Sequence, residues 1–189
     1  IKYAFTGDTD FNKATSATRV GSGRRTLSSY TRCLIDPDTR KYARSSSSHP
    51  NVYTHIALEY HNELYDTDFV LGVILETNSS DNVDNYWYSI ENKTLKDISF
   101  FSEKDGKKYV LGSKQFRDAN RVELLNKNNG VVKFMTMTGL KLQSEGITKY
   151  QRKLKSIMTY NPEAKIQQFI KESVLEDKNI NLNKLKEAK

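Results

Sequence analysis

The chain has 189 residues, of which 37% are hydrophobic and 28% are charged, and its formal net charge is +7. This composition is typical of one soluble globular domain, and the lack of a long apolar run argues against a membrane-spanning protein. The single cysteine, Cys33, excludes an intrachain disulfide and a cysteine-based zinc site, which favours a reducing, cytoplasmic location.

Residues 1–50 predict a basic, loop-rich N-terminal segment of the same domain. Residues 6–29 are rich in Gly, Ser, Thr and Asp, a composition that favours an irregular loop. Residues 29–35 alternate in the manner of a short strand, and a turn around Pro37 follows. A second stretch that interrupts regular structure, "RSSSSHP", occupies residues 44–50.

Residues 51–142 predict a β-rich core. The nearly continuous apolar run at 68–77 has the length and composition of a central strand buried on both faces. The aromatic run at 85–90 predicts another strand, with Trp87 inside and its neighbours outside.

Two turn dipeptides lie between strand-like runs in the same region. Asp105-Gly106 and Asn129-Gly130 both favour tight hairpins, because these residues adopt left-handed backbone conformations most readily. Residues 113–119 predict a helical turn between the two hairpins.

Residues 143–189 predict C-terminal helices. Apolar residues recur at helical spacing over 146–160, and Asn161-Pro162 is a typical helix start. The predicted fold class is therefore α+β, with an antiparallel or mixed β-sheet body and tight hairpins, followed by C-terminal helices.

The stretch "VYTHIALEYH" at 52–61 fits a strand and a helix almost equally well. As a strand it places His55, Glu59 and His61 on one face, where two imidazoles and a carboxylate are candidates for acid–base catalysis or, with a third group, for binding a metal. The alternative is a solvated polar face without chemistry, because no paired motif such as H-E-x-x-H is present.

Charge is distributed unevenly along the chain. Residues 51–106 carry eleven acidic and three basic residues, whereas 1–50 and 107–189 are both basic. Six of the nine arginines lie between Arg19 and Arg44. Clustered arginine in a basic domain predicts binding to DNA or RNA through phosphates, with a nuclease or a nucleic-acid-modifying enzyme as an extension. The predicted phosphate contacts are Arg24, Arg25, Arg32, Arg44, Lys149, Arg152 and Lys153.

Two other classes stay open. The serine run after Arg44, the amphipathic stretch and the strand that ends near Glu76 resemble the corresponding part of mono-ADP-ribosyltransferase toxins, although "IKYAF" lacks the arginine of their opening strand. That resemblance implies transfer from a nucleotide cofactor. The charge asymmetry equally predicts a non-enzymatic protein-interaction domain. No motif identifies a cofactor or an oligomeric state.

Overall fold

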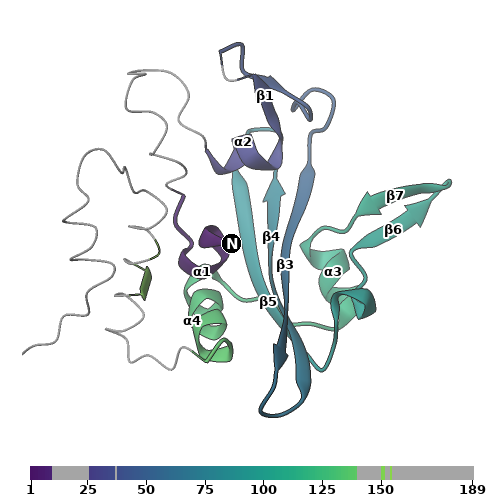
Figure 1. The fold of residues 1–189 in the computed structure, drawn as a ribbon. Helices are drawn as coiled ribbons and strands as arrows, with labels where there is room; N and C mark the ends of the chain where they lie inside the picture. The colour runs from purple at the N-terminus through teal and green to yellow at the C-terminus, as the bar shows by residue number, and fades with distance from the viewer. Residues whose placement is uncertain (10–25, 37, 140–149, 152–153, 155–189) are drawn as a thin grey trace, which may run out of the picture.

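The computed structural model describes residues 1–9, 26–36, 38–139, 150–151 and 154 (Figure 1). Its elements, in chain order, are α1 (Lys2–Thr6), α2 (Leu27–Thr31), β1 (Leu34–Asp36), β2 (Lys41–Tyr42), β3 (Val52–Asn62), β4 (Thr67–Thr77), β5 (Val83–Glu91), η1 (Leu95–Asp97), β6 (Phe101–Lys104), β7 (Lys107–Val110), α3 (Ser113–Asn120) and α4 (Lys127–Met137). The predicted α+β class is confirmed. The helices predicted for 143–189 fall outside the described residues, except that Tyr150, Gln151 and Leu154 are helical. No helix in the described part of the chain is long and apolar enough to cross a membrane.

A three-stranded antiparallel sheet forms the body, with β4 between β3 and β5. The β4 run from Val70 to Leu75 is buried without interruption, which confirms the prediction of a central strand covered on both faces. One face packs against α1 and α4, which contribute Phe5 and Phe134 to the first core cluster. The other face packs against α3, whose Phe116 belongs to the second cluster. Figure 1 shows these helices on opposite sides of the sheet.

The aromatic strand β5 contributes to both clusters. Trp87 is fully buried, as predicted, and its indole N–H donates to the Ala4 carbonyl at 2.9 Å. Tyr88 is also fully buried, so the prediction that both neighbours of Trp87 lie outside is wrong. Alternation places Tyr88 on the opposite face from Trp87, and that face is covered by Phe116 of α3, with ring centroids 4.7 Å apart.

The predicted hairpin at Asn129-Gly130 is also wrong, because both residues lie in helix α4. The helix is capped by the Asn126 side chain, which accepts a hydrogen bond from the Asn129 N–H at 3.0 Å. Gly130 is required for close packing rather than for a turn: a Cβ at this position would lie 2.1 Å from the Cβ of Trp87. Val131 and Phe134 then face the core at helical spacing.

Two of the other local predictions are confirmed, and one is largely wrong. Asp105 and Gly106 have φ values of 51° and 69° and connect β6 to β7, so this hairpin is confirmed. The helix predicted at 113–119 is confirmed as α3. The strand predicted at 29–35 is largely wrong, because Thr26 caps helix α2 and the strand begins only at Leu34.

Candidate nucleic-acid interface

Strand β3 settles the conformation of the stretch that carries the predicted catalytic residues. His55, Glu59 and His61 lie at alternate positions of this strand and therefore on one face of it. A strand rises about 3.3 Å per residue, which separates His55 from His61 by about 20 Å along its length. The side chains share a face, but they cannot act together on one reacting atom.

His55 is held within the second core cluster. Its Nε2 lies 2.8 Å from the Leu111 carbonyl oxygen, and its ring packs against Phe100 and Phe116 with centroids 5.5 and 4.9 Å away. Burial lowers the pKa of this imidazole, although the Leu111 carbonyl opposes that shift. The ring is thus part of the packed interior, and its buried Nδ1 has no hydrogen-bond partner among the described residues.

Glu59 and His61 have separate local partners. A Glu59 carboxylate oxygen accepts a hydrogen bond from the Leu95 N–H at 2.6 Å, at the first turn of η1. His61 Nδ1 lies 2.8 Å from Asp68 Oδ1 across the β3–β4 hairpin, and the hydrogen bond to Asp68 raises the pKa of His61. The geometry does not support the predicted shared acid–base centre.

Arg32 is a correction to the predicted phosphate contacts. Its side chain is 1% exposed, and its Nε donates to the Asp81 carboxylate. Its two terminal nitrogens donate to four backbone carbonyls, those of Arg44, His49, Pro50 and Asn78. All five N–H donors of the guanidinium are therefore used, and none is left for a phosphate.

The other predicted phosphate contacts divide into two groups. Arg44 is exposed, next to the serine-rich turn. The remaining ones lie outside the described residues: Arg24, Arg25, Lys149, Arg152 and Lys153.

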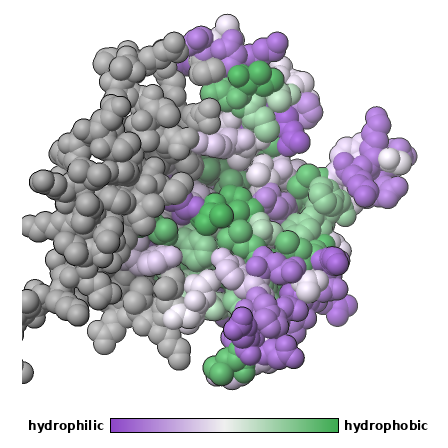
Figure 2. Space-filling view, viewed as in Figure 1, coloured by the Kyte–Doolittle hydropathy of each residue, from purple (hydrophilic) through white to green (hydrophobic). Residues whose placement is uncertain are grey.

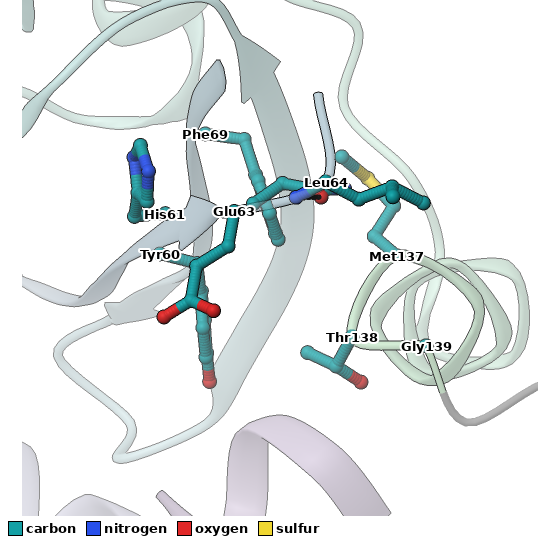
Figure 3. A pocket seen from close by; sticks show the side chains of 9 residues that line it. Tyr60, His61, Glu63, Leu64, Phe69, Met137, Thr138 and Gly139 are labelled. Carbon is teal, nitrogen blue, oxygen red and sulfur yellow. Dashed lines mark hydrogen bonds between the residues drawn. The ribbon is translucent and has the colours of Figure 1, made fainter. Parts of the chain in front are cut away.

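A pocket of about 700 Å³ opens between the β3–β4 hairpin and the end of α4 (Figure 3). Its walls combine the apolar side chains of Tyr60, Phe69 and Met137 with the polar groups of His61 and Glu63. The hairpin end from residue 59 to 68 carries four acidic residues and no Lys or Arg. This negative charge disfavours phosphate groups at the pocket.

A different surface presents exposed cations. Strands β6 and β7 form a two-stranded antiparallel ribbon, residues 101–110, which projects from the body (Figure 1). Its residues are exposed except for the half-buried Val110, and Figure 2 shows it as a hydrophilic lobe apart from the rest of that face. The stem is closed where the Leu111 N–H donates to the Phe100 carbonyl at 2.9 Å.

The two faces of the ribbon differ in charge. Pairing of Lys104 with Lys107 and of Ser102 with Tyr109 places these four residues on one face, which carries no acid. Glu103 pairs with Lys108 on the other face, together with Phe101. Among the ion pairs of the described residues, none involves a lysine of the ribbon.

Helix α3, which follows the ribbon in the chain, also carries exposed cations. It begins three residues after β7 ends, and it buries Phe116 and Asn120 on its inner side. Lys114 and Arg117 are exposed three residues apart on the helix, and such positions lie close together on a helix surface. Arg117 is partly neutralised by Asp118, at 3.0 Å.

No protein-family model, curated protein or solved structure matches this chain. Within the described ranges, no group of three His, Cys, Asp or Glu side chains could hold a metal ion. The similarity to ADP-ribosyltransferases implied a helix before the core strand, but the serine run forms turns and strand β3 follows it directly. Sequence reasoning located the ribbon's turn but did not identify its exposed lysines as one surface, although "KDGKK" already shows lysines on both sides of that turn.

Proposed function

We propose that this protein binds nucleic acid through the cationic face of the β6–β7 ribbon. The observation that supports this most strongly is the pair Lys104 and Lys107, placed directly opposite each other with no acidic residue on their face. Like charges at opposing positions of a sheet destabilise it, since their Cβ atoms lie about 5 Å apart. A bound phosphate between the two ammonium groups converts this repulsion into two attractive contacts.

The rest of the ribbon fits the same ligand. Tyr109 is 49% exposed on that face, so its ring is available to pack on a base or a sugar. Lys114 and Arg117 of α3 add further cations near the stem. Arg44 and the five basic residues outside the described ranges remain part of the proposal, whereas Arg32 does not. No catalytic step is included, because His55 is separated from His61 by about 20 Å along β3 and the three residues form no common centre.

Salt dependence of binding tests the proposal. Affinity for a short duplex should fall steeply as salt rises, because each phosphate contact releases a counterion. The variant Lys104→Ala/Lys107→Ala should reduce the slope of log K against log salt by about 2, or about 0.9 for each lost contact. The control Lys93→Ala/Lys96→Ala removes the same charge outside the ribbon and should keep the slope. Equal slopes for the two variants, or a flat salt dependence of the wild type, would remove the proposal.

Protein–protein interaction is a second candidate, supported by the exposed tip of the β3–β4 hairpin. Leu64 and Tyr65 at the tip of the β3–β4 hairpin are 81% and 72% exposed, within the acidic stretch described above. This acidic tip is complementary in charge to the ribbon, so copies of the chain should associate at low salt. Sedimentation at low and high salt measures this, and a monomer under both conditions would eliminate self-association.

A further inference from the structure

We infer that the ribbon enters the major groove of B-form duplex DNA, an inference that rests on the proposed nucleic-acid binding. The first reason is shape. Four residues per strand at about 3.4 Å each make the ribbon about 14 Å long, longer than the depth of the major groove, about 8.5 Å. The ribbon can therefore reach the base edges while its stem stays outside the groove.

The thickness of the ribbon fits the major groove of B-form DNA better than the other grooves of duplex nucleic acids. A sheet with side chains on both faces occupies about 10 Å, which the major groove of B-form DNA accepts at about 12 Å. The minor groove, about 6 Å wide, is too narrow. The major groove of an RNA duplex is deep and narrow, and side chains cannot read it. Shape thus favours duplex DNA over duplex RNA.

The placement of the aromatic rings disfavours single strands. Proteins that bind single strands stack successive bases on neighbouring aromatic rings. Here Phe101 and Tyr109 are both exposed but lie on opposite faces of the ribbon, so each face offers one ring. In a groove of a duplex, by contrast, each face of the ribbon would lie against one of the two phosphate backbones.

Three lysines lie near the leading end of the ribbon, whose turn also carries Asp105. Lys104 and Lys107 flank the turn at the leading end, where ammonium groups can donate to guanine O6 and N7. Lys108 lies on the opposite face and can meet the other phosphate backbone. Lys114 and Arg117, close to the stem in sequence, are the candidates for phosphates at the rim of the groove.

Binding to matched probes of one sequence tests this inference by fluorescence anisotropy. Duplex DNA should bind at least about tenfold more tightly than duplex RNA or single-stranded DNA, a difference of about 1.4 kcal/mol. Glucosylated 5-hydroxymethylcytosine in place of cytosine fills the major groove and should weaken binding by a similar factor. Netropsin, which occupies the minor groove, should leave binding unchanged. Lys104→Ala/Lys107→Ala should remove the preference for duplex DNA, and Lys93→Ala/Lys96→Ala should retain it.

The possible failures are distinct. Salt-dependent binding to all probes with equal affinity, or binding that glucosylation does not weaken, overturns groove insertion and leaves nucleic-acid binding in place. Competition by netropsin also overturns it. Absence of binding to every probe at low salt removes the proposed function as well. Circular dichroism of each variant checks that the fold is retained, which is expected because the ribbon is exposed.

Discussion

Replacement of Gly130 by alanine sets helix propensity against packing at the contact between α4 and β5. In an exposed helix this substitution stabilises by about 1 kcal/mol, because alanine is the better helix former. At Gly130 an added Cβ would lie 2.1 Å from the Cβ and 2.2 Å from the Cγ of Trp87. Non-bonded carbon atoms prefer about 3.5–4.0 Å, so helix and strand would have to separate by more than about 1 Å.

Neither side of this contact can move freely. Trp87 is fully buried, and its indole N–H is bound to the Ala4 carbonyl. Its backbone exchanges two hydrogen bonds of 2.9 and 2.8 Å with Leu125, just before α4 begins. Overpacking costs about 1–3 kcal/mol, and the upper end applies because the clash involves atoms close to both backbones. After the gain in propensity of about 1 kcal/mol is subtracted, we expect Gly130→Ala to lose about 2 kcal/mol.

Urea unfolding followed by the fluorescence of Trp87, the only tryptophan, measures this loss. The melting temperature should fall by about 4–8 °C, given about 2–4 °C per kcal/mol for a chain of this size. Asn129→Ala is the control, because Asn129 is exposed in the same helix and its substitution should stay within about 0.5 kcal/mol. If Gly130→Ala is as stable as the wild type, α4 does not pack against Trp87 at this distance.

Three other substitutions test buried or paired polar groups. Arg32→Lys supplies three donors instead of five and should lower the free energy of unfolding in urea by at least about 2 kcal/mol. The slope of DNA affinity against salt should stay unchanged. A reduced slope in a variant of full stability would contradict the structural role of Arg32. Tyr88→Phe removes a buried hydroxyl that has no hydrogen-bond partner among the described residues, and it should raise the free energy of unfolding by about 1 kcal/mol. A loss of stability would instead reveal a partner. Asp68→Asn should lower the pKa of His61 in an NMR titration, because the carboxylate stabilises the protonated ring. The stabilisation from the His61–Asp68 pair is complete below the ordinary histidine pKa, about 6.5, and is lost as pH rises through the raised pKa of His61. A loss of stability in Asp68→Asn that does not change with pH would count against this pair.

The parts of the fold that local patterns determine were predictable. The run from Val70 to Leu75 is apolar because both of its faces are covered, and the turn at Asp105-Gly106 uses the backbone freedom of those residues. Asn129-Gly130 is also a turn-type dipeptide, but its glycine is present for a different reason. There the missing side chain makes room for Trp87, which lies more than forty residues away in sequence. Long-range packing of this kind leaves no local periodicity to recognise.

The candidate site was harder to predict because a cation in the sequence does not reveal its burial. Arg32 lies in the arginine-rich segment, yet its guanidinium is enclosed by carbonyls from two distant loops. Lys104 belongs to the stretch with the most negative charge, yet it is exposed on a face free of acids. His55 and His61 share a strand face, as the strand alternative predicted, but the separation between them follows only from the extended conformation.

Because the stem is closed at Phe100 and Leu111, we expect the hairpin beyond it to be dispensable for folding. Since residues 101–109 contribute no buried side chain to either core cluster, substitutions, insertions or an exchanged loop there leave the rest of the molecule undisturbed. The residues proposed to contact nucleic acid can therefore change without altering either core cluster. We expect that this nine-residue segment can be exchanged while the scaffold that carries it stays the same.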